Sequence, residues 1–192
     1  MTLRFLRSIA PTRRFATQIA CAAAVVIPLS ACTPKYDWRE VRGTDTPFTV
    51  LLPAKPSTYT RPVNLGGIKA NMTMTAAEID DVTFAVGTAE LPDTAQAQAA
   101  LLAMKETLVK NINGVVRQEK TQLGSTRSTI ELEAGPGAAQ SAASKTGGDK
   151  EIALHARFFA RDRRVYQVIV AGRERAIRPE SVDTFLTSFK ID

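Results

Sequence analysis

The chain has 192 residues, of which 25 are basic, 19 are acidic, two are cysteine and one is histidine. A single histidine excludes a metal site built on a pair of histidines. The length that remains after the N-terminal segment, about 150 residues, is enough for one domain that buries roughly two thirds of its unfolded surface. We therefore expect one folded domain whose stability comes from its hydrophobic core.

The first 31 residues have the parts of an export signal. Four arginines and no acidic residue accompany an apolar stretch at 15–29. That stretch contains Thr17 and Gln18 and meets Pro28, so it is less suited to a permanent membrane span, which needs roughly 20 apolar residues. We expect residues 1–31 to be a cleaved signal peptide.

The apolar stretch ends with Leu29-Ser30-Ala31-Cys32. These residues resemble the lipobox of bacterial lipoproteins, in which the cysteine becomes the first residue of the mature chain and carries acyl chains. The resemblance implies cleavage between Ala31 and Cys32, lipidation of Cys32 and attachment to a membrane. A rival interpretation is an ordinary secretory signal cut near Ala31, which leaves no lipid.

Two weaker signals lie within the leader. Cys21 follows too short an apolar run to be the lipidated residue, and we interpret it as part of the signal. Thr12-Arg13-Arg14-Phe15 resembles a twin-arginine signal, but Ala16 and Thr17, which come after Phe15, are less apolar than that motif requires.

Removal of the leader changes the charge. Four basic residues and no acidic residue precede Cys32, so the chain from Cys32 onward has a net charge of +2. A nearly balanced domain lacks the basic surface of a nucleic-acid-binding protein, and we expect no nucleic-acid partner. Acylation of Cys32 and loss of Cys21 would also leave no disulfide.

Residues 32–46 are polar, and we interpret them as a lipidated N-terminus and tether. Tyr36, Trp38 and Arg39 are candidate contacts with a partner or with the membrane, since amphipathic aromatic side chains favour the membrane interface. In the alternative interpretation, Trp38 packs against the domain and holds the tether in place.

The folded domain is expected to occupy residues 47–192. Apolar residues alternate at 48–52 and predict a strand that ends at Pro53. The pattern then predicts strands at 68–79 and 82–91, joined by a tight acidic turn.

A helix is predicted next, because the spacing of apolar residues changes from every second residue to every third or fourth residue. Asp93 is a candidate N-cap with Gln96 three residues later. Asn113-Gly114 tolerates the left-handed conformation that ends helices. The apolar stripe of this helix is Leu101, Met104, Leu108 and Ile112.

Two polar strands are predicted at 115–123 and 128–133, and after them a mobile loop at 134–150 that is rich in Gly, Ala and Ser. A hairpin is predicted at 151–160 and 164–171. Both faces of its second strand are apolar, which predicts a central strand covered on two sides. A final helix is predicted from the spacing of Val182, Phe185, Leu186 and Phe189.

These elements predict an α+β fold, a single antiparallel β-sheet with one helix packed on each face. Four segments are distinctive: Phe48 to Pro53, the Phe84 strand ending at Pro92, Tyr166-Gln167-Val168 and Phe185 to Phe189. Together they resemble the PsbP-like α/β/α sandwich proteins over about residues 48–191. This resemblance implies a mostly non-enzymatic group. The lipobox, tether and domain together also resemble uncharacterised lipoproteins of Gram-negative bacteria.

The domain offers few residues for catalysis. We interpret His155 as an ordinary strand residue rather than a base. Glu131 and Glu133 alternate with apolar residues, which is typical of a solvated strand face. Met72 and Met74 share a strand face and are interpreted as core filling rather than a soft-metal site. We predict no enzyme activity, no cofactor and no metal.

Arginines gather near the last hairpin, where such clusters can bind phosphate or carboxylate groups. Interspersed glutamates favour a solvated rim instead. The seven arginines are Arg157, Arg161, Arg163, Arg164, Arg173, Arg175 and Arg178.

These patterns favour a lipoprotein anchored in the outer membrane and facing the periplasm, acting as a non-catalytic binding or assembly module with an envelope protein as partner. Thr33 comes directly after Cys32, where the resemblance to known sorting signals would place an aspartate for inner-membrane retention. The alternative locations are the periplasmic face of the inner membrane and the periplasm itself. The alternative function is a small-ligand carrier or hydrolase with its site under the 134–150 loop.

Overall fold

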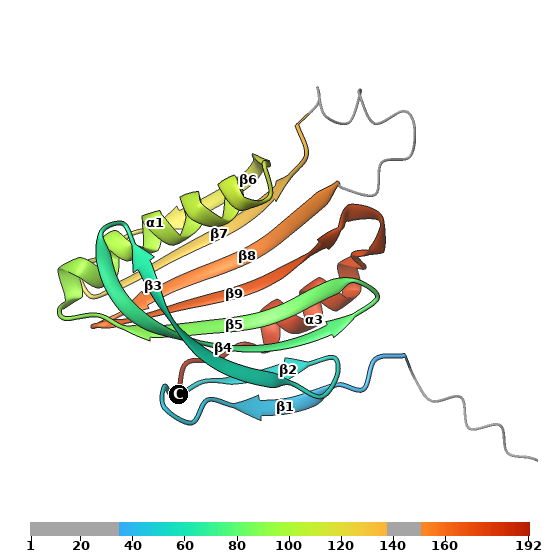
Figure 1. The fold of residues 1–192 in the computed structure, drawn as a ribbon, viewed down its shortest axis with the longest axis horizontal. Helices are drawn as coiled ribbons and strands as arrows, with labels where there is room; N and C mark the ends of the chain where they lie inside the picture. The colour runs from blue at the N-terminus through green and yellow to red at the C-terminus, as the bar shows by residue number, and fades with distance from the viewer. Residues whose placement is uncertain (1–34, 138–150) are drawn as a thin grey trace, which may run out of the picture. The chain divides into compact units, whose positions relative to one another are not determined.

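Seven antiparallel strands form the large sheet of the protein (Figure 1). The computed structural model of the chain describes residues 35–137 and 151–192. The strand order across the sheet is β3-β4-β5-β9-β8-β7-β6. The strands are β3 (Ser57–Leu65), β4 (Ile68–Ile79), β5 (Val82–Glu90), β6 (Val115–Gln122), β7 (Arg127–Gly135), β8 (Ile152–Arg161) and β9 (Arg164–Arg173).

A second, two-stranded sheet precedes the large one. It pairs β1 (Arg39–Arg42) with β2 (Thr49–Leu52) in antiparallel register. The α+β class is confirmed, but the prediction of a single sheet is wrong. The physical reason is that Val50 and Leu52 pack onto a face of the large sheet, so this hairpin covers that sheet instead of extending it.

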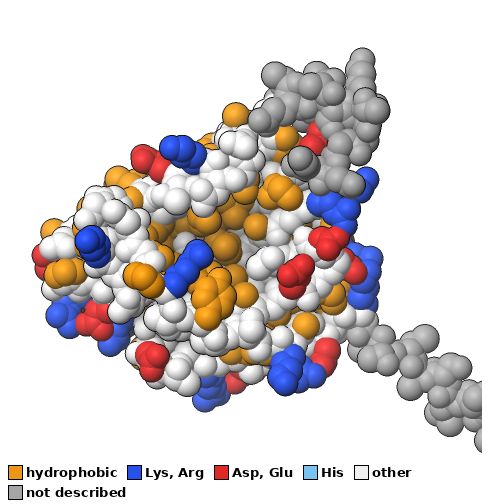
Figure 2. All heavy atoms as spheres, in the orientation of Figure 1, with side chains coloured by type: hydrophobic (Ala, Val, Ile, Leu, Met, Phe, Trp, Pro, Cys, Tyr) orange, Lys and Arg blue, Asp and Glu red, His pale blue; other side chains and the backbone are white. Residues whose placement is uncertain are grey.

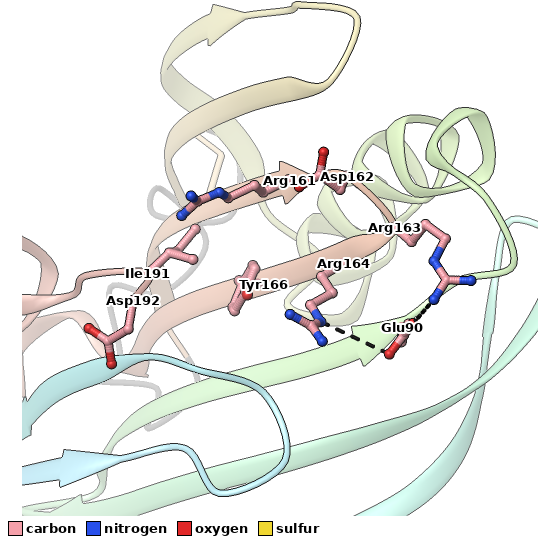
Figure 3. A pocket seen from close by; sticks show the side chains of 8 residues that line it. All are labelled: Glu90, Arg161, Asp162, Arg163, Arg164, Tyr166, Ile191 and Asp192. Carbon is pink, nitrogen blue, oxygen red and sulfur yellow. Dashed lines mark hydrogen bonds and ion pairs between the residues drawn. The ribbon is translucent and has the colours of Figure 1, made fainter.

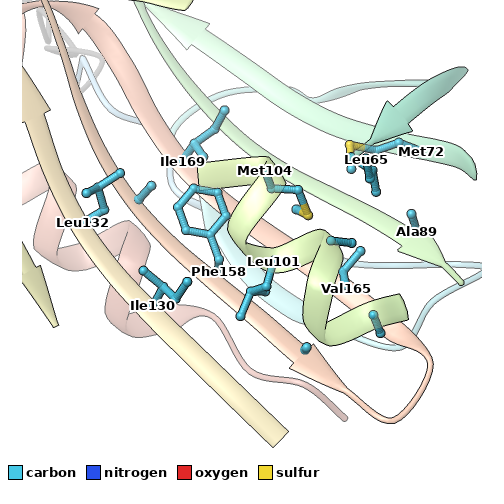
Figure 4. Packing of buried hydrophobic residues seen from close by; sticks show 14 of the residues in the cluster. Leu65, Met72, Ala89, Leu101, Met104, Ile130, Leu132, Phe158, Val165 and Ile169 are labelled. Carbon is cyan, nitrogen blue, oxygen red and sulfur yellow. The ribbon is translucent and has the colours of Figure 1, made fainter. Parts of the chain in front are cut away.

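Two hydrophobic clusters hold the helices to the large sheet. In the first, α1 (Thr94–Asn111) buries Leu101 and Met104 against side chains of β7, β8 and β9 (Figure 4). In the second, α3 (Pro179–Ser188) buries Val182 and Phe185 together with the β1–β2 hairpin. A short 3₁₀ turn, η1 (Glu174–Ala176), leads from β9 toward α3.

The two clusters lie on opposite faces of β9. Val165 and Ile169 belong to the first cluster, whereas Tyr166, Val168 and Val170 belong to the second. Side chains of a strand alternate between faces, so each cluster takes one face. The predicted central strand, buried on both sides, is confirmed.

Several local predictions are confirmed by the backbone. Asp80 and Asp81 form the β4–β5 turn with φ of 53° and 62°. The backbone N–H of Gln96 donates to Oδ1 of Asp93 at 2.8 Å, which is the predicted N-cap. Asn113 comes after α1 with a φ of 50°, which is the predicted stop.

The sequence patterns did not predict two of the strands, β1 and β3. Both are ordered by pairing with a neighbouring strand. β1 lies within the predicted tether and contains Val41 as its one apolar residue, so it is ordered by pairing with β2. β3 is an edge strand with mostly exposed side chains and a proline, Pro62. Neither has the alternation that marks a half-buried strand.

The predicted loop at 134–150 differs from the structure at its start. Ala134 and Gly135 pair with β6 and belong to β7. Residues 138–150 lie outside the described residues, so the rest of this prediction stays a prediction.

Phe185 is the main contact of α3 with the sheet. It is fully buried, and its ring meets that of Phe84 edge to face at 5.5 Å. We expect Phe185→Ala to lower the free energy of unfolding by about 3–5 kcal/mol, because a cavity replaces the ring. Urea denaturation measures this loss. Leu123→Ala is the control, since Leu123 is 66% exposed and its loss should change stability by about 0.5 kcal/mol or less.

Candidate functional site

The face of the sheet that carries α3 changes character at β8. On β9 this face is hydrophobic and carries Tyr166, Val168 and Val170, whereas charged and polar residues occupy it over much of β6, β7 and β8. The register aligns them in two rows across the three strands. One row is Gln118, Glu133 and His155, and the other is Lys120, Glu131 and Arg157.

Two cavities, of about 320 and 290 Å³, lie over these rows beside α3. They share Glu133, His155, Arg157 and Leu186, so we treat them as one surface and call it the charged groove. The groove is flanked by α3 because Leu186 lines both cavities. It lies on the face of β7 and β8 that α1 leaves uncovered, since α1 packs on the opposite side.

Ion pairs connect the walls of the charged groove. The guanidinium of Arg117 on β6 binds both carboxylate oxygens of Glu174 on η1. Arg157 on β8 places Nε 3.3 Å from Oε1 of Glu131 and donates from Nη1 to the carbonyl of Leu186 at 3.0 Å. The groove therefore holds both signs of charge, largely paired within it.

His155 lies at the centre of the charged groove. Its side chain is 25% exposed, and Nδ1 is 4.0 Å from Oε2 of Glu133. Burial lowers the pKa of His155, with a further lowering from Arg117, while Glu133 and Glu174 raise it. The lowered pKa favours the neutral form of the imidazole.

The groove lacks a nucleophile for His155 to activate. No serine, threonine or cysteine is found among the described residues that line it. The carboxylate of Glu133 is too distant from Nδ1 for a hydrogen bond. The sequence interpretation of Glu131 and Glu133 as a solvated face agrees with their exposed fractions of 41% and 35%.

Another cavity, of about 320 Å³, lies at the β8–β9 turn (Figure 3). Arg163 and Arg164 both approach the carboxylate of Glu90, the former at 2.5 Å. Arg161 lines the same cavity, together with the carboxylates of Asp162 and Asp192. Positive and negative groups are balanced here, so the cavity does not select an anion by charge.

The predicted arginine cluster is thus not one site. Arg157 lies in the charged groove, three others surround the β8–β9 turn, and Arg173 pairs with Asp81 at the opposite end of β9. The glutamates and aspartates beside them give the solvated rim that the sequence favours.

The predicted contact residues near the N-terminus lie against the second cluster. Tyr36 stacks on Trp38 at 5.7 Å, and Trp38 meets Phe84 edge to face at 6.2 Å. This is the packing that the alternative interpretation of Trp38 expects. Arg39 is exposed and pairs with Asp37. Contact of Tyr36, Trp38 and Arg39 with a partner or membrane stays a prediction.

Of the other residues singled out in the sequence, some are buried and some lie outside the described residues. Met72 and Met74 are buried in the first cluster, as expected of core filling. Ala31 and Cys32 lie outside the described residues. Within 35–137 and 151–192, no three acidic, histidine or cysteine side chains gather as metal ligands. None of the helices in these ranges is long and apolar enough to cross a membrane.

Sequence reasoning missed Arg117 and Glu174 as members of a site. The two residues are 57 positions apart and sit in different elements. No local pattern marks such a pair, because only the folded sheet brings β6 and η1 together.

The pKa of His155 predicts a pH dependence of stability. Because burial lowers this pKa below the ordinary 6.5, the unfolded chain binds more protons than the folded one just below pH 6.5. The free energy of unfolding should therefore fall as the pH drops through this window. Urea denaturation of wild type and His155→Gln across the window measures the effect, which the variant should lack.

The titration of Glu174, which falls in a more acid pH range, serves as an internal control. The hydrogen bond from Arg117 lowers the pKa of Glu174 below its ordinary 4.5, so stability from this carboxylate is lost only at more acid pH. An equal fall in stability of both proteins between about pH 6.5 and pH 5 would contradict the assignment to His155.

Comparison of the sequence with protein families and with curated proteins gives no match. A functional assignment for this domain therefore rests on its sequence motifs and on the geometry of its described residues.

Proposed function

We propose that this protein is a lipoprotein of the bacterial envelope, anchored in the outer membrane through acyl chains on Cys32, whose domain binds a partner protein without catalysis. The lipobox-like residues Leu29 to Cys32 support the anchor, and Thr33 supports the outer membrane. More than one acyl chain gives stable attachment. The domain would then face the periplasm.

The charged groove is the observation that carries the binding role. It presents charges of both signs on rigid strands and is open beside α3. Paired, partly exposed charges of this kind contribute little to stability, so they can exchange partners with a polar protein surface at small cost. Complementary charges set specificity and the rate of association more than affinity.

The arrangement of layers also supports a binding module. A large antiparallel sheet covered by α1 on one face and by α3 with the β1–β2 hairpin on the other agrees with the likeness to PsbP-like α/β/α sandwich proteins. That likeness implies a mostly non-enzymatic group. The absence of a hydroxyl or thiol among the described groove residues supports the same conclusion.

A small-ligand carrier or hydrolase with a site under the 134–150 loop is the second candidate. The specific observation that favours it is that the segment leaves β7 beside the charged groove, where Arg117 donates to the carbonyl of Pro136 at 3.4 Å. Deletion of residues 138–148 separates the candidates. A binding module should keep its partner after the deletion, whereas a ligand carrier should lose its ligand.

The anchor is tested by Cys32→Ser. We expect the variant to leave the membrane fraction and to take up no labelled palmitate, because no acyl chain can be attached. Fractionation and metabolic labelling measure both outcomes. A variant that still fractionates with membranes would contradict the proposed anchor.

The partner surface is tested by site-specific photo-crosslinking in intact cells. A photoreactive residue at Gln118 or Lys120, both in the groove, should capture the same envelope protein, and Glu131→Lys should reduce the yield several-fold by reversing one charge. The matched control is a photoreactive residue at Glu106 on α1, which is exposed on another surface. Capture from position 106 alone would contradict the assignment.

A further inference from the structure

Strand β6 forms one edge of the large sheet. It is the last strand in the sheet order, and within the described residues it pairs with β7 alone. All eight of its residues are exposed. An edge strand presents a row of backbone N–H and C=O groups without strand partners, and another chain can pair with them. The β6 edge therefore offers backbone hydrogen bonds to a partner.

The opposite edge, β3, is less suited to such pairing. It contains Pro62, and proline has no backbone N–H to donate. β6 contains no proline, and its ladder with β7 is regular from Gln118 to Gln122, beyond the irregularity between Val116 and Gln118. Of the two edges, β6 is the one that can accept a regular ladder.

Exposed hydrophobic side chains gather at the two ends of β6. Among the described residues, five large hydrophobic side chains are exposed, and three of them lie on β6 or directly after it. Val115 is 50% exposed, Val116 43% and Leu123 66%. Covering apolar surface contributes favourable free energy to association, so the edge gains from a segment that lies along its whole length.

The charges of the α3 face alternate in sign toward this edge. In one row of the charged groove, Arg157 is followed by Glu131 and then by Lys120 on β6. Opposite charges at paired positions of antiparallel strands stabilise a sheet. None of the described carboxylates forms an ion pair with Lys120, so an acidic residue on an added strand would continue the alternation. Figure 2 shows the face that carries α1, where charged side chains of both signs are scattered instead.

A second copy of the chain cannot supply this acidic residue. The acid of β6 is Glu119, which pairs with Leu132 of the first cluster and so lies on the α1 face. Lys120 lies on the α3 face, because neighbouring residues of a strand alternate between faces. Two β6 strands paired about a two-fold axis place residues of the same face opposite each other. The segment that complements Lys120 therefore belongs to a different protein.

We propose that an extended segment of the partner protein adds to β6 as an antiparallel eighth strand of the large sheet, with an acidic residue opposite Lys120. This inference rests on the proposed function and specifies how the partner binds, since Gln118 and Lys120 belong both to the charged groove and to the edge. Backbone hydrogen bonds supply affinity in such strand addition, and side chains supply specificity. A lysine on an edge disfavours segments without a complementary charge.

The test is site-specific photo-crosslinking of the full-length protein in intact cells, with photoreactive residues on both faces of β6. Gln118 and Gln122 represent the α3 face, and Glu119 and Thr121 represent the α1 face. A strand at the edge contacts both faces, so all four positions should capture the same protein. Capture from Gln118 and Gln122 alone would overturn strand addition and leave the partner in the groove.

Two other results are equally decisive. Absence of capture from all four positions would contradict the proposed partner, and strand addition with it. Capture of a second copy of this chain would overturn the assignment of the edge to a different protein.

The direction of the added strand is tested by mapping the crosslinked residues with mass spectrometry. In an antiparallel pair, the partner residue captured from Gln122 precedes the one captured from Gln118 along the partner chain. We expect an acidic residue between them. The reverse order would overturn the antiparallel arrangement, and a segment without an acidic residue would overturn the role of Lys120.

The charge pair is tested by Lys120→Glu, with the crosslinking yield from Gln118 as the readout. We expect a loss of about threefold to tenfold, because an opposite-charge pair becomes a like-charge pair. Changing the mapped acidic residue of the partner to lysine should restore the yield. The control is Lys69→Glu, an equal charge change at an exposed position of β4, which should leave the yield unchanged. An equal loss in both variants would show that net charge alone governs binding and would overturn the pair.

Discussion

Two-sided burial of β9 is the constraint on which the rest of the structure depends. Val165 and Ile169 face α1, while Tyr166, Val168 and Val170 face α3 and the β1–β2 hairpin. Burial of apolar area on both faces supplies most of the free energy that orders the strand. The same strand hydrogen-bonds to β5 and β8, so it joins the two halves of the sheet. Both covering layers of the domain therefore pack against this one strand.

The candidate site lies where the layer that covers the α3 face of the sheet stops. On that face, α3 and the β1–β2 hairpin pack over residues of β4, β5 and β9. The strands β6, β7 and β8 carry the two charged rows on the same face, and the result is the charged groove.

Polar groups in the charged groove are satisfied to different degrees. Arg117 binds both carboxylate oxygens of Glu174. Nε of Arg157 is buried and has no hydrogen-bond partner among the described residues, although Oε1 of Glu131 is 3.3 Å away. An unsatisfied buried polar group costs free energy, so the groove gains from a partner that supplies an acceptor to Arg157.

The sequence alone determined the local elements of this protein. The alternation in β4, β5 and β9, the N-cap at Asp93 and the stop at Asn113 all depend on neighbours within a few residues, and each was predictable. The solvated face of Glu131 and Glu133 was predictable for the same reason.

The tertiary structure alone decided the second sheet, the edge strand β3 and the charged groove. β1 and β3 carry too little apolar pattern to be seen and are ordered by pairing with β2 and β4. Arg117 meets Glu174, and Gln167 meets Met74, across 57 and 93 residues. Contacts of that range are set by strand order and by which face each helix covers, because side-chain periodicity specifies a face but not the element that packs on it.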